Sequence, residues 1–353
     1  TLYYTWGSIV EPGYVPSDPS SSDPQPMPNK ELAWERTAQI NYGVDFSLLG
    51  ARISGSLDYF TSKTTNLLLA REIPSVNGYT FTYDNIGSTS NKGVELSLNT
   101  VNITNRNFTW ESTLSFTHSR DRIDELSLGK MDEVGNGWFI GERLSVYYDY
   151  VKEGIWQNTP EDLAEMAKYN ADNNANFVPG SIKVKDLNGD YVIDANNDRQ
   201  IIGHSSPDWN FGFGNTFTYK NFDLSFFIYG RGGFMVRSGA EVLQGRYAQR
   251  VVDYWTPENP TNNYPSPNYA SAAGDTYKNS MDYQDGTFIK LRNASLGYSF
   301  GSNVLERLKL SKLRIYAQAM NPGLLYSKVD WIDPDLGGST FNRGVVFGLN
   351  IGL

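Results

Sequence analysis

Long segments of this chain alternate apolar and polar residues with a period of two, and this pattern constrains the fold more than any other feature. Ile53, Leu57 and Tyr59 alternate with polar residues, and residues 343–353 show the same period. Such a period places the apolar side chains on one face of a β-strand. We therefore expect nine strands of about 10–14 residues, roughly twice the usual globular length, at 37–49, 51–63, 91–101, 108–119, 209–219, 222–231, 286–300, 311–321 and 343–353.

The connections between these strands alternate between short and long. Short turns are expected at 49–51, 102–107, 220–221 and 301–310, and long excursions at 64–90, 120–208, 232–285 and 322–342. Short turns on one side and long loops on the other are typical of outer-membrane β-barrels. If all short turns lie on one side of the sheet and all long loops on the other, the segment 120–208 must begin and end on the same side. It then adds either no strand to the sheet or an even number of strands. A helix is expected at 160–169, where Pro160-Glu-Asp makes a good first turn.

Composition supports an all-β chain and excludes several functions. The chain has 23 Tyr, 18 Phe, 8 Trp and 33 Gly, and no Cys that could form a disulfide or a thiolate site. A net charge of −9 argues against a nucleic-acid partner, whose phosphates need a basic surface. Mean hydropathy of −0.45 and the lack of a long apolar run exclude a transmembrane helix but not a membrane barrel of alternating strands.

An oxygen-rich loop follows the EF-hand spacing in part. Asp186, Asn188 and Asp190 stand at positions 1, 3 and 5 of that pattern, although the usual Gly at position 6 and Glu at position 12 are absent. The sequence predicts a structural Ca²⁺ site, and the alternative is a solvated acidic turn held by Asx hydrogen bonds. In this site Val192 would offer its carbonyl oxygen, and Asp198 would close the site in place of the missing Glu. The expected ligands are Asp186, Asn188, Asp190, Val192, Asp194 and Asp198.

Aromatic residues of the 120–208 excursion are candidates for stacking on a substrate. The four named for this role are Trp138, Tyr147, Tyr148 and Trp156. The alternative is that these rings pack the loop against itself or against a partner protein.

The sequence offers no catalytic site. His118 and His204 are the only histidines, no nucleophile-elbow sequence is present, and no carboxylate pair stands out from the others. Glycines of Gly212-Phe-Gly214 and Gly230-Arg-Gly-Gly233 fall in predicted strands, where glycine favours close packing over phosphate binding. We therefore expect that the chain is not an enzyme.

Several short motifs occur in a fixed order along the chain. They are Asn29-Lys-Glu-Leu-Ala-Trp-Glu35, Asn91-Lys-Gly-Val-Glu-Leu96, Asp186–Gly203, Tyr219-Lys-Asn-Phe-Asp-Leu-Ser225, Phe288-Ile-Lys-Leu-Arg-Asn293, Asp333-Pro-Asp335 and Phe347-Gly-Leu-Asn350. Together they resemble the SusC/RagA family of TonB-dependent outer-membrane proteins. The chain departs from that pattern in two places. Tyr191 stands where the family has Gly, and the last residue is Leu353, whereas barrels of this kind commonly end in an aromatic residue.

The resemblance implies an antiparallel transmembrane β-barrel of roughly 22 strands with a plug, of which this chain supplies the C-terminal ten or so strands. It divides the chain into a first loop and strand end at 1–36, barrel strands at 37–119, a long extracellular excursion at 120–208 and C-terminal barrel strands at 209–353. Residues beyond this chain would supply the plug, the N-terminal strands and the contact with TonB.

The implied function is import of oligosaccharide or peptide across the outer membrane of Bacteroidota, in contact with its lipid. The implied partner is a SusD/RagB-like surface lipoprotein that acts as a lid. The patterns leave open a different class of protein, a soluble or surface-anchored β-rich glycan-binding protein, because sandwiches and solenoids also alternate.

Overall fold

The structure, a computed structural model, describes residues 26–74, 79–173, 175–239, 251–267, 275–336 and 342–353. Most of the predicted first segment, 1–36, lies outside the described residues. The chain divides into two compact units, one of Thr1–Asn102 with Glu111–Ser145, and one of Ile103–Trp110 with Val146–Leu353. No helix in the described ranges is long and apolar enough to cross a membrane.

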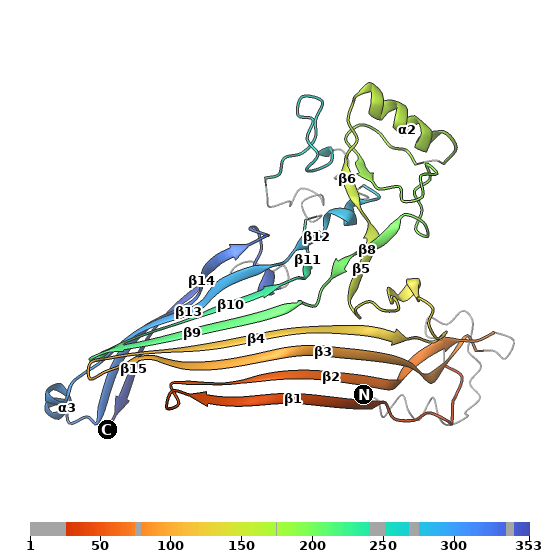
Figure 1. Cartoon of the computed structure of the whole chain (residues 1–353). Coiled ribbons are helices and arrows are strands. Elements are labelled where there is room, and N and C mark those ends of the chain that lie inside the picture. Colours follow the sequence, from red (N-terminus) through yellow and green to blue (C-terminus); the bar gives the residue numbers. More distant parts are fainter. Residues whose placement is uncertain (1–25, 75–78, 174, 240–250, 268–274, 337–341) are drawn as a thin grey trace. The chain divides into compact units, whose positions relative to one another are not determined.

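The first unit is an antiparallel sheet of four neighbouring strands (Figure 1). These are β1 (Arg36–Leu48), β2 (Ile53–Glu72), β3 (Phe81–Thr104) and β4 (Phe108–Glu125). The turn between β1 and β2 has positive φ at Leu49, Gly50 and Ala51, so the chain reverses within four residues. The first residues of β4 belong to the second unit.

The second unit carries five further neighbouring strands of the sheet. In sheet order they are β9 (Trp209–Tyr219), β10 (Phe222–Gly232), β13 (Phe288–Ser299), β14 (Lys312–Ser327) and β15 (Gly344–Gly352). A short helix, α3 (Ser302–Leu308), fills the turn between β13 and β14. All nine predicted strands are thus present, and in the described residues β1 and β15 form the two open edges of the sheet.

Two predicted loops were too long. We expected a connection at 64–90, but β2 continues to Glu72 and pairs with β3 from Phe81 onward. Asn66 has a φ of 60°, and the register shifts between Thr65 and Leu67, so a bulge resets the alternation that the sequence argument followed.

The strand expected at 311–321 is also longer than predicted. β14 runs through Asn321 and Pro322 to Ser327, although proline lacks the N–H that a sheet ladder needs. Asn321 has a φ of 47°, and the pairing with β13 shifts register between Leu291 and Asn293. The proline therefore sits beside an irregularity and does not end the strand.

The excursion between β4 and β9 folds into its own small elements. In the described residues it holds four strands paired as two separate ribbons, so it adds no strand to the nine-strand sheet, which is the first of the two expected outcomes. The ribbons are β5 (Val146–Tyr150) with β8 (Arg199–His204), and β6 (Lys152–Ile155) with β7 (Ile182–Val184). Helix α2 (Pro160–Asn173) begins where predicted and ends four residues later than residue 169.

The remaining elements are short and lie in connections between the strands of the sheet. β11 (Met235–Arg237) pairs with β12 (Tyr283–Asp285). Three 3₁₀ turns are η2 (Val134–Asn136), η6 (Lys278–Met281) and η7 (Pro334–Leu336).

The hydrophobic cores of the second unit lie in these connections. One cluster contains Ile155, Ile182, Val184, Trp255 and Met281. A second contains Trp156, Met166, Tyr169 and Phe177, and a third joins the end of the sheet to its loops through Phe234, Val236, Phe288, Val329 and Ile332.

One face of the sheet, in contrast, exposes apolar side chains to the surroundings. In the second unit, Leu224, Leu296, Ala317 and Phe347 form one cross-strand row, and Phe347 is 80% exposed. The adjacent row is Phe222, Tyr298, Ile315 and Leu349. The first unit has two equivalent rows, one of Tyr42, Tyr59 and Val94 and one of Val44, Leu57 and Leu96. We call the rows of the two units together the apolar face.

The opposite face of the second unit's strands is polar. Ser225, Ser295 and Gln318 form one row across β10, β13 and β14. Arg314 Nε donates to Asp223 Oδ1 at 2.9 Å, and this ion pair passes over Gly297, where a Cβ would lie 2.4 Å from the guanidinium. Glycine at 297 therefore makes room for an ion pair on the polar face.

Packing of the third core gives a stability prediction. Val329 is 1% exposed, so Val329→Ala removes two buried methyl groups and leaves a small cavity, which should lower the free energy of unfolding by about 2 kcal/mol. Val251, which is fully exposed, provides the matched control, and Val251→Ala should leave stability unchanged. Urea titration of the two variants in detergent checks this, and equal midpoints would contradict the assignment of the core.

Candidate functional site

The acidic loop, residues 186–198, connects β7 to β8 and is built from successive Asx turns. Asp186 Oδ1 accepts the Gly189 N–H at 2.7 Å, and Asp186 Oδ2 accepts the Tyr191 N–H at 2.9 Å. Asp190 Oδ1 accepts the Val192 N–H at 2.8 Å. Backbone N–H groups thus occupy the side-chain oxygens that the sequence offered as cation ligands.

Asp198 closes the loop from its far end. Its side chain is 1% exposed, and its two oxygens accept the N–H groups of Leu187 at 2.9 Å and Asp194 at 2.8 Å. One buried carboxylate therefore ties the first and last parts of the loop together.

Asp194 anchors the tight turn that precedes Asp198. The Asn197 side-chain amide, followed by the backbone N–H groups of Asn196 and Asn197, holds the pKa of the Asp194 carboxyl below its usual value. Those donors stabilise the charged form of a solvent-exposed group.

The loop packs on α2 through aromatic rings. The Tyr169 hydroxyl donates to Asp186 Oδ2 at 3.3 Å, and the Tyr169 and Tyr191 ring centroids lie 5.3 Å apart. Burial, with the adjacent Asp186 carboxylate, raises the pKa of the Tyr169 hydroxyl. Lys168 Nζ lies 4.7 Å from the centre of the Tyr191 ring. Tyr191, which stands where the SusC/RagA motif has Gly, therefore has a packing role.

The geometry of the acidic loop does not test the predicted calcium site. Within the described part of the chain, no group of three or more His, Cys, Asp or Glu side chains is close enough to hold a metal ion. The structure brings the six predicted ligands into one loop, but Asp186 and Asp198 are directed to main-chain N–H groups. Calcium binding therefore stays a prediction.

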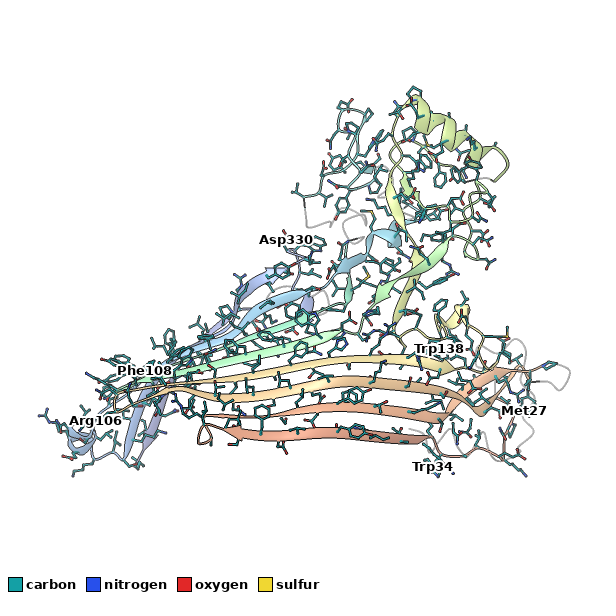
Figure 2. The ribbon with its side chains drawn as sticks, viewed as in Figure 1. Met27, Trp34, Arg106, Phe108, Trp138 and Asp330 are labelled. Atoms are coloured by element: carbon teal, nitrogen blue, oxygen red, sulfur yellow. The ribbon has the colours of Figure 1, made fainter. Side chains whose placement is uncertain are left out.

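The four predicted substrate aromatics do not converge. Trp156 is 1% exposed and packs against Tyr169 and Phe177, so its ring offers almost no surface to a ligand. The Tyr147 and Tyr283 ring centroids lie 5.2 Å apart with the rings tilted by 48°, and the Arg199 guanidinium lies 5.1 Å from the centre of the Tyr148 ring. Trp138, labelled in Figure 2, belongs to the first unit and pairs through its backbone with Glu133.

A polar cavity that the sequence did not indicate lies in the second unit. Its volume is about 400 Å³, and it contains amide, charged and aromatic side chains from segments far apart in the chain. The lining includes Lys152, Asp253, Asn263, Tyr264, Gln284 and Trp331. No local pattern could have found it, because it forms only when β6, β12 and the segments at 251–264 and 331 come together.

Hydrogen bonds order the rim of this cavity. Lys152 Nζ donates to the carbonyl oxygens of Asn262 at 2.6 Å and Asn263 at 3.1 Å, and burial lowers its pKa. The side chains of Thr261, Asn259 and Asn263 donate to Asp253 and hold the pKa of its carboxyl below the usual value. The cavity thus presents fixed hydrogen-bonding groups beside the Trp331 ring, which suits a polar ligand.

Comparison with known proteins decides the family. Residues 1–321 match the family model described as TonB dependent receptor-like, beta-barrel. The chain belongs to this family. The resemblance that the motifs indicated is confirmed, and the nine-strand sheet is a part of the family's antiparallel barrel that is not closed within the described residues.

Relatives of this TonB-dependent receptor chain include two named proteins. It is 31% identical over 330 residues to TonB-dependent receptor P3 of Formosa agariphila, covering 87% of this chain and 31% of the relative. It is 27% identical to TonB-dependent receptor SusC of Bacteroides thetaiotaomicron, covering 95% of this chain and 33% of SusC. The chain therefore spans about a third of the length of these relatives.

A solved structure supports the fold. The RagAB peptide importer in the "open-open" state superposes with a TM-score of 0.73 at 21% identity, over 93% of this chain and 36% of that one. The family is one of TonB-dependent transporters and not of enzymes, in agreement with the lack of a catalytic pattern in the sequence.

The role of Asp198 can be tested in the receptor chain. Asp198→Ala leaves two partly buried N–H groups without their acceptor, so local opening of the acidic loop should become easier by about 2 kcal/mol. Limited proteolysis should then cut within 186–198 faster than in the wild type. Asp330→Ala, at an exposed carboxylate labelled in Figure 2, is the control and should not change the cleavage rate. Unchanged cleavage in Asp198→Ala would contradict the closing role.

Proposed function

We propose that this chain is part of a TonB-dependent outer-membrane transporter that imports oligosaccharide or peptide together with a SusD-like lipoprotein lid. The complete protein would form a plugged barrel of roughly 22 strands, and parts outside this chain would provide the plug and the contact with TonB. The long connections would face outward and the short turns inward, as in other barrels of this kind.

The apolar face is the observation that carries the membrane part of the proposal. It exposes Phe347, Tyr42 and Val44 at 80%, 65% and 63%, and it continues in unbroken cross-strand rows over several strands. Soluble proteins rarely expose contiguous apolar surfaces of this kind. Lipid acyl chains accept an exposed apolar face, and a sheet whose backbone groups are paired with one another leaves none of them unsatisfied in lipid.

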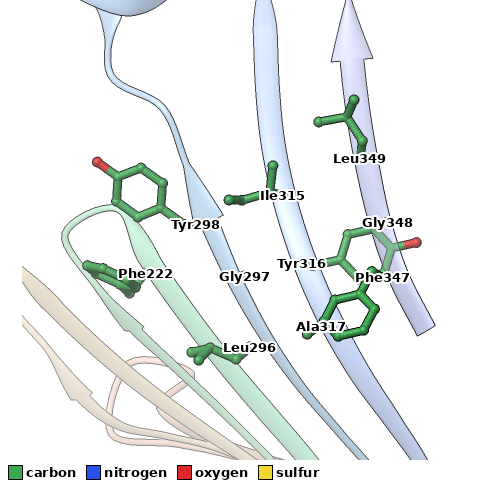
Figure 3. Close-up of a pocket in the computed structure, with 10 residues that line it drawn as sticks. All are labelled: Phe222, Leu296, Gly297, Tyr298, Ile315, Tyr316, Ala317, Phe347, Gly348 and Leu349. Atoms are coloured by element: carbon green, nitrogen blue, oxygen red, sulfur yellow. The ribbon is translucent and has the colours of Figure 1, made fainter. Parts of the chain in front are cut away.

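The shape of this face also suits lipid. A groove of about 520 Å³ runs over β10, β13, β14 and β15, and Leu296, Ile315, Phe347 and Leu349 stand along it (Figure 3). The backbone of Gly297 and Gly348 also lines it. A soluble or surface-anchored glycan-binding protein, the other candidate, would have to cover this groove, so the membrane assignment is favoured.

The polar cavity supports the transport part. The Lys152 ammonium, the amides of Asn263 and Gln284, and the Trp331 ring offer both hydrogen bonds and an aromatic surface. Both candidate substrate classes use such groups, oligosaccharides through hydroxyls and ring faces, and peptides through amides. The resemblance to the SusC/RagA family motivates the two classes, and RagAB is a peptide importer.

The experiment that tests the proposal deletes the gene that encodes the full-length protein and measures growth on oligosaccharides and on peptides as sole nutrients. We expect loss of growth on one class, and co-purification of a surface lipoprotein with the protein in detergent. The proposal would be wrong if the protein needed no detergent and the deletion changed growth on neither class.

A pair of neighbouring substitutions tests which face meets lipid. Leu296→Arg puts a charge on the apolar face and should destabilise the inserted barrel by about 2–4 kcal/mol. Ser295→Arg, one residue away on the polar face, should insert normally. Heat-modifiable migration on gels reports the folded fraction, and equal fractions for the two variants would contradict the assignment of the faces.

Calcium binding by the acidic loop is part of the proposal as a structural element. Asp186, Asn188 and Asp190 supply the hard oxygen donors that Ca²⁺ prefers, and the ion would rigidify the loop. Asp190 Oδ1 and Asp194 Oδ1 accept main-chain N–H groups, and each carboxylate has further lone pairs for a cation.

Titration calorimetry with CaCl₂ tests this element. We expect saturable heat with the wild type and none with Asp190→Asn/Asp194→Asn, while MgCl₂ serves as the control cation. Absence of heat in the wild type would leave the acidic loop as an Asx-bonded turn.

A further inference from the structure

We propose that the first unit binds the phosphate of a phosphorylated glycolipid headgroup in the outer leaflet of the membrane, at a basic cavity on its apolar face. The inference rests on the proposed membrane location and adds a specific lipid ligand to it. The cavity has a volume of about 430 Å³ and is lined by Thr61, Ser90, Asn91, Lys92, Arg120, Arg122 and Gly141.

Cross-strand pairing places this cavity beyond the end of the apolar rows. Tyr59 pairs with Val94 in the last apolar row of β2 and β3, and the next row on that face pairs Thr61 with Lys92. Thr61 also pairs with Ile40 of β1, which is 53% exposed on the same face. The face therefore changes from apolar to cationic within one row.

The fourth strand continues the same change. Arg120 and Arg122 occupy even positions of β4, the parity of Leu114 and Phe116. The odd positions face the other way, since Asp121 Oδ1 pairs with Arg143 Nη1 at 3.2 Å and Ile123 is only 1% exposed. The two arginines thus join Lys92 on the outward side of the sheet.

The height of the cavity matches a membrane boundary. Thr61 lies eight positions beyond Ile53, the first residue of β2 after its short turn. At about 3.3 Å per residue this is about 26 Å along the strand, and a tilt of about 40° reduces it to roughly 20 Å across the bilayer. Since the apolar band of such barrels is about 25 Å tall, these residues stand about 5 Å inside its boundary on the long-connection side, from which long Lys and Arg side chains reach the headgroups.

The charges in and around the cavity leave it cationic. Lys92 forms no ion pair with any described residue, and Arg120 reaches Glu142 only at 3.9 Å with both side chains largely exposed. Arg122 pairs with Asp124 at 2.7 Å, and Ser90 Oγ also donates to Asp124. Lys63, paired with Ser90 in the following row, adds a fourth cation to the same face.

These groups fit a phosphate attached to a sugar. Guanidinium groups bind phosphate oxygens through paired N–H donors, and an ammonium group adds a mobile charge. The Thr61 hydroxyl beside them can hydrogen-bond a sugar hydroxyl. Acyl chains of the same lipid would then lie along the apolar rows directly below, which commits the site to a lipid and not to a free anion.

The test uses the full-length protein that contains this chain, extracted in mild detergent. Lys92→Gln/Arg120→Gln removes two cations from the cavity, and the control Arg106→Gln/Lys220→Gln removes two cations from the short turns at the other end of the strands. Purified lipid A with its phosphate and enzymatically dephosphorylated lipid A are the probes, and native mass spectrometry measures the bound lipid.

The expected result is a loss of about tenfold in affinity for phosphorylated lipid A in the cavity variant and little change in the control. Dephosphorylated lipid A should bind the wild type as weakly as the phosphorylated form binds the cavity variant. The inference would be overturned by equal affinity in both variants, by equal binding of the two probes, or by competition from millimolar inorganic phosphate, which would indicate a free-anion site.

Failure of the inference is separable from failure of the proposed function. Heat-modifiable migration and detergent dependence are measured on the same preparations. If these hold while lipid A binding is unchanged in the cavity variant, the transporter proposal stands and the glycolipid site is wrong.

Discussion

The structure depends on backbone hydrogen bonding between long neighbouring strands. β1 and β2 pair through thirteen residues, and β3 pairs with β2 over nearly its whole length. This pairing satisfies the hydrogen-bonding groups of the main chain within the sheet. Because those groups are paired with one another, neither face of the sheet needs water. One face is then free to carry apolar side chains outward, and the other to carry ion pairs such as Asp223–Arg314.

This arrangement moves the hydrophobic cores away from the sheet. A soluble β protein buries the apolar side of its strands, whereas here that side is exposed and the buried clusters form in the connections, around Trp156 and Ile182. The excursion between β4 and β9 therefore folds as a small packed structure. Its rigidity in turn orders the polar cavity and the acidic loop.

A buried ion cluster joins the sheet to the connection that follows β14. Lys290 Nζ lies 3.1 Å from Asp333 Oδ2 and 2.6 Å from Asp335 Oδ2, and Lys290 and Asp333 are almost fully buried. Burial of three charges is costly unless each is paired, so this cluster strongly specifies one placement of the 328–336 segment. That segment carries Val329 and Ile332 into the third core, and Trp331 to the cavity.

The sequence by itself determined the strands, their two faces and the family, because alternation and short motifs are local properties of the chain. It misjudged the ends of β2 and β14, where a residue with positive φ at Asn66 or Asn321 shifts the pairing without ending the strand. Only the tertiary structure decided that Trp156 is buried and which residues share a cavity. Those outcomes depend on contacts between residues up to about a hundred or more positions apart, such as Lys152 with Asn262, and no local pattern encodes them.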